Sequence, residues 1–299
     1  MKVRVPATAA NLGPGYDCLG MALDIWNELT VERGPFRVNI TGEGAAQLPR
    51  DETNLIVKTV VAAFEAAGEP VPGLSYTCRN AIPLTRGLGS SSAAIVSGLA
   101  AGAKLSGLDR RLDRAALFSM AADIEGHPDN AAPATLGGCR VGIRDGDRWI
   151  ADRVRLPEGI VAVLFIPDVE GSTATARAIL PREVPMVDAV FNMGRAALLV
   201  NALASGNLGF LRQATEDRLH QPARSRLYPG MNELIGAALD AGAHGAFLAG
   251  AGPAVMALAT ARHDAVLAGM EQAARELGVA GRAIATRPVE TGVQVVEAG

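Results

Sequence analysis

The stretch from Pro83 to Ala94 constrains this chain more than any other part. It reads Pro-Leu-Thr-Arg-Gly-Leu-Gly-Ser-Ser-Ser-Ala-Ala and continues into small and apolar residues that favour a helix. A glycine loop that leads directly into a helix exposes unpaired backbone N–H groups and the positive end of the helix dipole. Helix starts of this kind bind anions, phosphate above all. The stretch therefore predicts a phosphate-binding loop, with an ordinary turn and N-cap as the alternative interpretation.

Comparison with two common phosphate-binding motifs shows which groups this loop can use to bind phosphate. No lysine lies near residues 87–92, so the loop lacks the lysine of a Walker A motif. Ser92 stands where a dinucleotide-binding fingerprint would carry its third glycine. Such a loop must use backbone N–H groups and serine hydroxyls, and the balancing positive charge must come from elsewhere. We expect Mg²⁺ to supply it, held by a serine and by a carboxylate such as Glu125.

Composition limits the class of partner. The 299 residues are 49% hydrophobic, which suffices for one large domain or two ordinary ones. The net charge of −3 and the lack of a basic run disfavour nucleic acid and anionic membranes as partners. Three widely spaced cysteines suggest neither a zinc site nor a disulfide framework, and the N-terminus lacks the apolar run of a secretory signal. We expect a cytoplasmic protein that acts on a small molecule.

Local signals predict the elements of the first half of the chain. One helix is expected to begin after Asn54 and another after Asp113, because both residues are good N-caps. Residues 22–32 and 36–41 predict the two strands of a hairpin, since Arg-Gly-Pro joins them. Pro128 is expected to break the chain at the end of the Asp113 helix, in a turn.

The character of the chain changes near residue 150. A polar turn precedes a continuous apolar run at 160–166, which predicts a buried strand. Helices, two strands, a helix and a strand follow, an order typical of an antiparallel α+β sandwich. The apolar segment 186–204 predicts a packing helix, with a homodimer contact as its alternative use. We expect two domains, 1–152 and 153–299, with further helices at 208–219 and 231–241.

Five segments, in order along nearly the whole chain, resemble the motifs of the GHMP kinases, named for galactokinase, homoserine kinase, mevalonate kinase and phosphomevalonate kinase. The resemblance is strongest to the homoserine kinase branch of that superfamily. It implies a two-domain GHMP kinase fold, with an N-terminal domain like ribosomal protein S5 domain 2 and a C-terminal ferredoxin-like α/β sandwich. It also implies ATP and Mg²⁺ as cofactors. The matching segments are 7–17, 83–91, 125–133, 221–230 and 250–253.

Carried over by position, the resemblance implies two sets of binding residues. The nucleotide set has Asn54 near the adenine, with Pro83, Arg86, Gly87, Leu88, Gly89, Ser90, Ser91 and Ser92 around the phosphates. The amino-acid set is Asn11, Asp17, His127, Asn130, Thr173, Arg177, Arg224 and Gly250. Ser91 and Glu125 are the implied metal ligands, and Ser91, Glu125, Asn130 and Arg177 are the residues expected to carry catalysis.

The amino-acid set also makes chemical sense without the resemblance. A zwitterionic amino acid needs a carboxylate for its ammonium group, and Asp17 can supply it. It needs a guanidinium fork for its own carboxylate, and Arg177 and Arg224 can provide one. The implied function is ATP-dependent phosphorylation of the side-chain hydroxyl of L-homoserine, on the route to threonine. The alternatives are another GHMP small-molecule kinase, directed at mevalonate or a sugar, and a non-catalytic ligand sensor.

Two departures from the general motifs matter. Ala251 replaces a serine in the last segment, so that loop is expected to act through its backbone. Asn130 stands where many GHMP kinases have an aspartate base, a trait of the homoserine branch. Phosphoryl transfer through a loose transition state depends mainly on positioning and charge neutralisation, so a strong general base is not required.

Overall fold

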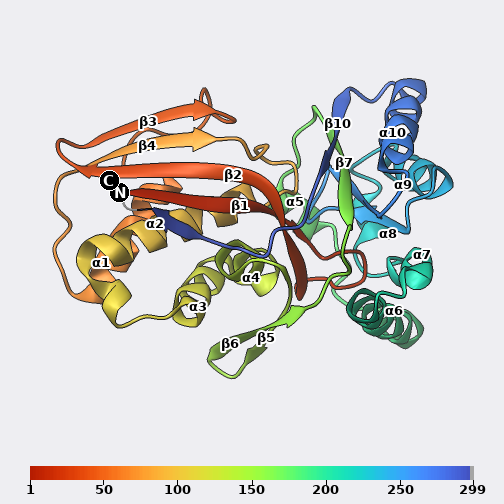
Figure 1. The fold of residues 1–299 in the computed structure, drawn as a ribbon, viewed down its shortest axis with the longest axis horizontal. Helices are drawn as coiled ribbons and strands as arrows, with labels where there is room; N and C mark the ends of the chain where they lie inside the picture. Colours follow the sequence, from red (N-terminus) through yellow and green to blue (C-terminus); the bar gives the residue numbers. More distant parts are fainter. Residues whose placement is uncertain (297–299) are drawn as a thin grey trace.

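Two sheets organise the chain in the computed structural model, which describes residues 1–296 (Figure 1). The first sheet has seven strands in the order β11-β1-β2-β4-β3, and β5 joins the other end of β2 and pairs with β6. All its pairings are antiparallel except that of β3 with β4. The strands are β1 (Lys2–Ala10), β2 (Leu19–Arg33), β3 (Arg37–Gly42), β4 (Leu74–Asn80), β5 (Cys139–Asp145), β6 (Arg148–Val154) and β11 (Gln294–Val296).

Four helices cover one face of this sheet (Figure 1). The apolar side chains of β1 and β2 meet α2 in the core, where Val5, Met21, Val96 and Leu99 are all fully buried. The small residues of α2 allow a close approach to α1: a Cβ at Gly98 would collide with the Thr59 side chain. The helices are α1 (Leu55–Ala67), α2 (Ser90–Ser106), α3 (Arg114–Glu125) and α4 (Pro128–Leu136), with a 3₁₀ turn at Leu108–Arg110.

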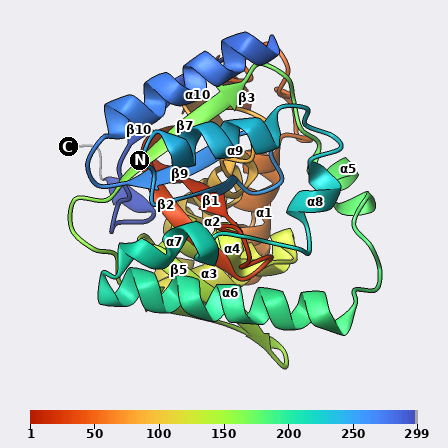
Figure 2. The same cartoon turned by 90° about the vertical axis from the view of Figure 1, so that its right-hand side faces the viewer.

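The second sheet has four antiparallel strands in the order β10-β7-β9-β8. Counted along the chain, this is the order 4-1-3-2 of a ferredoxin-like sandwich, so the expected fold class is confirmed. Helices α9 and α10 cover one face, while Leu164 and Met256 on the other face join the core of the first sheet (Figure 2). The elements are β7 (Val161–Pro167), α5 (Thr173–Ala178), α6 (Met186–Ser205), α7 (Leu211–Ala214), α8 (Gln221–Arg224), α9 (Met231–Asp240), β8 (Gly245–Leu248), β9 (Val255–Ala259), α10 (His263–Leu277) and β10 (Gly281–Thr286), with a 3₁₀ turn at Leu208–Phe210.

The predicted hairpin of residues 22–32 and 36–41 is wrong. Both strands form, but β4 lies between them, and β3 pairs in parallel with β4. The crossover is held by Gly34, whose N–H donates to Gly73 O at 3.0 Å, and by Ser75, whose hydroxyl donates to Pro35 O at 2.6 Å. Alternation of polar and apolar residues reports a strand but not its partner.

Two further expectations need correction. Pro128 ends nothing by itself: it is the first residue of α4, the position where proline is favoured. The helix expected at 208–219 stops at Ala214. There the Thr215 hydroxyl donates to Leu211 O at 2.8 Å, and the Asp217 carboxylate then accepts three backbone N–H groups, which builds a turn instead of a helix.

Two strands connect the two sides of the expected division between residues 152 and 153. Strand β6 spans that point, and β11 returns from the second half of the chain to pair with β1, with Lys2 opposite Val296. Neither strand was expected from the sequence. The division at 152 therefore stays a prediction, while the first sheet contains residues from both halves.

Candidate active site

A cleft of about 530 Å³ opens between the two halves of the molecule. Its lining includes the glycine loop before α2, the Asp17 and Arg177 side chains, and Asn54. All but two of the residues predicted from the sequence line this cleft; Pro83 and Ser92 are buried behind it. The structure thus brings together segments that lie up to 239 residues apart, as in the contact of Asn11 with Gly250.

The glycine loop has the geometry of an anion-binding helix start. Gly87 and Gly89 have φ of +76° and +69°, and Gly89 is the N-cap of α2, with no side chain of the described residues capping the helix. A Cβ at Gly87 would collide with Ala249 O, and one at Gly89 with the Thr8 hydroxyl. The loop is therefore fixed between the first and last motif segments, and the first N–H groups of α2 are left for a ligand.

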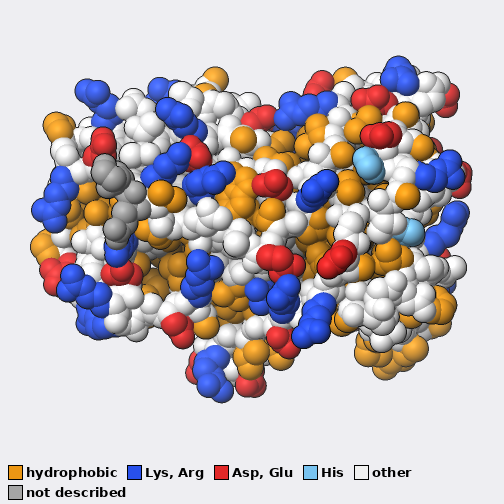
Figure 3. All heavy atoms as spheres, in the orientation of Figure 1, with side chains coloured by type: hydrophobic (Ala, Val, Ile, Leu, Met, Phe, Trp, Pro, Cys, Tyr) orange, Lys and Arg blue, Asp and Glu red, His pale blue; other side chains and the backbone are white. Residues whose placement is uncertain are grey.

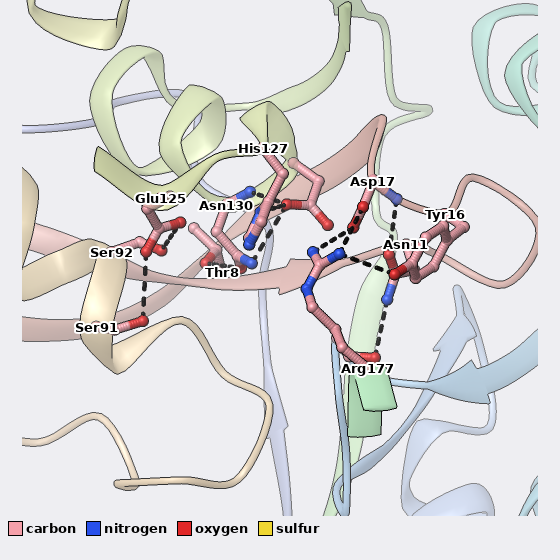
Figure 4. Close-up of polar contacts among 12 residues, drawn as sticks. Thr8, Asn11, Tyr16, Asp17, Ser91, Ser92, Glu125, His127, Asn130 and Arg177 are labelled. Atoms are coloured by element: carbon pink, nitrogen blue, oxygen red, sulfur yellow. Dashed lines mark hydrogen bonds and ion pairs between the residues drawn. The ribbon is translucent and has the colours of Figure 1, made fainter. Parts of the chain in front are cut away.

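Glu125 at the end of α3 faces the start of α2 (Figure 4). The Ser91 hydroxyl donates to Glu125 Oε1 at 3.3 Å, and the Ser92 hydroxyl donates to Oε2 at 2.6 Å. Burial raises the pKa of Glu125, although the two serine bonds oppose the shift. A carboxylate with hydroxyl neighbours is the donor set that Mg²⁺ prefers, and a cation beside Glu125 would offset the cost of burying its charge, so these residues fit the expected metal.

Three residues that were predicted to bind the nucleotide make hydrogen bonds within the protein. Ser92 is 1% exposed, so its hydroxyl holds Glu125 from behind the cleft. The Arg86 guanidinium donates to Leu84 O at 2.8 Å, Pro167 O at 2.8 Å and Asp168 O at 2.6 Å, which ties the loop to the end of β7. The Asn54 side chain caps α1. Direct nucleotide contacts by these residues stay predictions.

Asp17 and Arg177, which both line the cleft, form a two-bond ion pair (Figure 4). Arg177 Nη1 and Nη2 donate to the two carboxylate oxygens at 2.8 and 2.7 Å, and Nη1 also donates to Tyr16 Oη at 2.9 Å. These bonds raise the pKa of Arg177, with the hydrogen bond to Asp17 as the largest cause. Thr173 lies one turn before Arg177 on α5, so both residues are on the same side of that helix.

Arg224 is a buried cation, only 2% exposed. Its Nε donates to Ala176 O at 3.2 Å and its Nη1 to Gly250 O at 3.0 Å, while none of the described carboxylates pairs with it. Burial lowers the pKa of Arg224 as a result. The Gly250 carbonyl also accepts from Asn11 Nδ2 at 2.8 Å, so the last motif acts through its backbone, as the alanine at 251 led us to expect.

A third cluster surrounds Asn130 at the start of α4 (Figure 4). The Thr8 hydroxyl donates to Asn130 Oδ1 at 2.7 Å, and Asp129 Oδ1 lies 2.6 Å from His127 Nδ1 and accepts the Asn130 N–H at 2.9 Å. Burial tends to lower the pKa of His127, but the bond and charge of Asp129 and the charge of Glu125 outweigh it and raise the pKa. Ligand atoms of Asp17, His127 and Asp129 lie within 4.8 Å of one another, an arrangement that suits a cationic group.

Sequence reasoning missed four residues of this site. Tyr16 and Thr8 lie inside the first motif segment, and Asp129 lies inside the third, but none received a role from the motifs. The Tyr16 ring lies against both site arginines, with the Cζ atoms of Arg177 and Arg224 at 5.6 and 5.4 Å from its centroid. The fourth, His220, directly precedes a motif segment and contacts Arg224.

Comparison with known proteins supports one family. The model of the GHMP kinases N terminal domain matches residues 54–138, and that of the GHMP kinases C terminal matches residues 199–277. The chain is 45% identical over 297 residues to the homoserine kinase of Streptomyces coelicolor, covering 97% of this chain and 96% of that one. It is 44% identical over 278 residues to the homoserine kinase of Moorella thermoacetica, covering 93% of both.

A solved structure agrees with these relatives. The crystal structure of homoserine kinase from Cytophaga hutchinsonii superimposes with a TM-score of 0.88 at 30% identity, covering 99% of this chain and 97% of that one. This likeness extends over both halves of the chain and includes the motif segments that form the cleft. The chain belongs to the homoserine kinase family of the GHMP kinases.

Proposed function

We propose that this protein phosphorylates the side-chain hydroxyl of L-homoserine and produces O-phospho-L-homoserine, in the cytoplasm, for threonine biosynthesis. The observation that carries this proposal is the pairing of two sites in one cleft. The phosphate loop before α2 lies beside a pocket that holds a buried guanidinium, Arg224, and a cluster of carboxylates around Asp17. A phosphoryl donor is thereby placed next to an acceptor that carries both a carboxylate and an ammonium group.

The donor side of the cleft fits ATP, the phosphate donor of a GHMP kinase. The free N–H groups at the start of α2 would bind the phosphates, and the backbone of Gly87 and Gly89 can approach them closely because neither residue carries a side chain. Ser91 and Glu125 would hold Mg²⁺, which supplies charge neutralisation on the phosphates when bound. Ser92 orients Glu125 for that task.

On the acceptor side, Asp17 and the neighbouring Asp129 and His127 cluster would receive the α-ammonium group, and the site arginines the α-carboxylate. Asn130 lies between this pocket and Glu125, and its amide is oriented because Oδ1 accepts from the Thr8 hydroxyl. The Asn130 Nδ2 group donates one N–H to Asp129 Oδ1 at 3.5 Å, and its second N–H would position the acceptor hydroxyl. With both ends of the amino acid fixed, transfer depends on orientation more than on a base.

Substrate comparison tests this proposal directly. We expect homoserine to be phosphorylated with a far higher kcat/KM than mevalonate or galactose, because neither alternative carries an ammonium group for Asp17. A coupled assay of ADP release, run on all three alcohols at saturating ATP and Mg²⁺, measures the ratio. Better turnover of either alternative would contradict the proposed substrate, and no ADP release with any alcohol would favour a ligand sensor.

The proposal also concerns helix α6, which has an exposed apolar face that a partner could cover. Met186, Val187, Val190 and Met193 are each more than half exposed, and they form one uncharged stripe along the outer edge of the molecule (Figures 2 and 3). Within the described residues this helix alone is long and apolar enough to cross a membrane by length and composition. Its charges lie on its flanks and are neutralised in two ion pairs, Asp188 with Arg218 and Arg195 with Glu216.

We propose that a second copy of the chain covers this stripe. An uncharged stripe meets its own copy across a two-fold axis without opposing like charges, whereas binding to an anionic lipid surface needs free basic residues along the flanks. The stripe covers the first two turns of α6, a length of about 10 Å. None of the four stripe residues lines the catalytic cleft, so the contact would leave the cleft open.

Met193→Glu is expected to convert a dimer into a monomer, because it places a charge within the stripe that the second copy would cover. Sedimentation or light scattering at micromolar protein measures the mass. Ile143→Glu, on the equally exposed surface of β5, is the matched control and should leave the dimer intact. A monomeric unsubstituted protein, or one that sediments with anionic vesicles through this helix, would contradict the proposal.

A further inference from the structure

His220 lies completely buried between the first motif segment and Arg224, with 0% of its surface exposed. Its Nε2 lies 2.7 Å from Gly13 O, and its Nδ1 lies 3.1 Å from Arg224 Nη1. A carbonyl can only accept, so Nε2 must carry the proton. A guanidinium can only donate, so Nδ1 must offer its lone pair. The two contacts together define one neutral tautomer of His220.

The surroundings of His220 favour the neutral ring. Burial lowers the pKa of His220, and the charge of Arg224 acts in the same direction, against those of Asp217 and Asp17. Asp217 Oδ2 lies 3.7 Å from His220 Nε2, but this carboxylate is already satisfied. It accepts from Asn192 Nδ2 and from the backbone N–H groups of Leu219, His220 and Gln221 at 2.6–3.0 Å.

Arg224 is held by acceptors on one side only. Nε is bound by Ala176 O, and Nη1 is bound by Gly250 O and by His220 Nδ1. Nη2 makes no hydrogen bond with any described residue, and the side chain lines the cleft. Only the two N–H groups of Nη2 are therefore left for a carboxylate, and their directions are set by the plane of the guanidinium.

We propose that neutral His220 is a positioning residue that holds the Arg224 guanidinium in the plane required to bind the α-carboxylate of the amino-acid substrate. The inference rests on the proposed function, and it adds a residue that touches no substrate. His220 then contributes to substrate specificity, because it raises the affinity only for acceptor alcohols that carry a carboxylate. An amino alcohol of the same length without that group gains nothing from it.

Two substitutions separate the contacts of His220. His220→Asn keeps an oxygen acceptor near the position of Nδ1 for Arg224 and loses the bond to Gly13. His220→Gln keeps a donor near the position of Nε2 for Gly13 and loses the acceptor for Arg224. The proposal therefore expects the glutamine variant to lose substrate affinity and the asparagine variant to retain most of it.

The test measures KM and kcat for homoserine, for ATP and for 3-aminopropan-1-ol, which is homoserine without its carboxylate. For His220→Gln we expect the KM for homoserine to rise about tenfold, the effect of one lost hydrogen bond to a charged group. The KM for ATP and the kcat/KM for 3-aminopropan-1-ol should stay unchanged. His220→Asn should stay within about threefold of the unsubstituted enzyme on every substrate.

Equal losses by His220→Gln on homoserine and 3-aminopropan-1-ol would overturn the proposal, since they would show a purely structural role. Equal losses by the two variants on homoserine would overturn it too. The double variant His220→Gln/Arg224→Met provides a second measurement, which is insensitive to small losses of stability. Once Arg224 is replaced, the added His220→Gln change should have no effect on the KM for homoserine. An unsubstituted enzyme that does not phosphorylate homoserine counts against the proposed function, whereas an active enzyme with an insensitive His220→Gln variant counts against this inference alone.

Discussion

Glu125→Gln is expected to lower kcat for homoserine by about 10²–10³-fold at saturating ATP and Mg²⁺, the range seen when a single transition-state charge contact is lost. Glutamine keeps the volume of the side chain and an oxygen that can accept from Ser91 and Ser92, so the start of α2 should remain in place. Only the negative charge is removed, and with it the principal hard ligand for the metal. Steady-state ADP release gives kcat, and a Mg²⁺ titration should show half-saturation at a higher concentration.

Asp123→Asn is the matched control for this change. Asp123 lies two residues earlier on the same helix, is exposed, and accepts from Trp149 Nε1 at 2.8 Å, away from the cleft. Its replacement should leave kcat and the Mg²⁺ dependence unchanged. A Glu125→Gln enzyme with unaltered kcat would remove Glu125 from the metal site and would revive the interpretation of the protein as a ligand sensor.

Arg224→Met is expected to raise the KM for homoserine by about 10²-fold or more, because truncating one partner of a buried charged contact costs about 2–5 kcal/mol. Methionine fills much of the same space, so the core around Ala176 and Gly250 should stay packed. Removing the guanidinium leaves the substrate carboxylate without its buried partner. The KM for ATP, measured in the same assay, should change little, since the hydrogen bonds of Arg224 go to Ala176, His220 and Gly250 and not to the phosphate loop.

Arg226→Met provides the comparison for the loss of a positive charge. Arg226 lies two residues further along the chain and is exposed, so its removal should not change the KM for homoserine. The carboxylate-free analogue 3-aminopropan-1-ol supplies an internal check, because Arg224→Met should not weaken its use. Equal effects of Arg224→Met on both alcohols would show that Arg224 supports the fold and does not bind a carboxylate.

Helix boundaries were predictable wherever a local signal determines them. Asn54 caps α1 with its Oδ1 at 2.9 Å from Ile56 N, and Asp113 caps α3 with its Oδ1 at 2.8 Å from Ala116 N. The left-handed glycine Gly107 ends α2. Each of these signals acts within one helical turn, so it can be interpreted from the sequence alone.

Strand pairing was not predictable in the same way. The segment 36–41 has the right alternation for a strand, but its partner β4 begins more than 30 residues later. Pro128 was interpreted as a helix breaker, yet the same fixed φ is favourable at the first position of a new helix. For β3 the sequence identified the strand but not its partner, and at Pro128 it identified the end of one helix but not the start of the next.

The same distinction between local and long-range signals applies to the residues of the candidate site. Some residues that line the cleft lie within the motif segments, and these could be named from the sequence because their spacing follows a family pattern. Asp17, Glu125 and Arg224 are examples. His220 was not named from the sequence, because nothing near it shows that Gly13, 207 residues away, accepts its hydrogen bond. Residues that position other residues act across long sequence separations, so only the folded chain reveals them.

The pairing of β11 with β1 has a consequence for the synthesis of the chain. Strand β1 is among the first segments to leave the ribosome, yet its outer neighbour is made only after every other strand and helix described in Figure 1. Until then, the N–H and C=O groups on that side of Lys2, Val3 and Arg4 have no partner in the sheet. The nascent N-terminal half therefore presents an open sheet edge throughout translation, and a fragment that ends at residue 152 would keep that edge permanently.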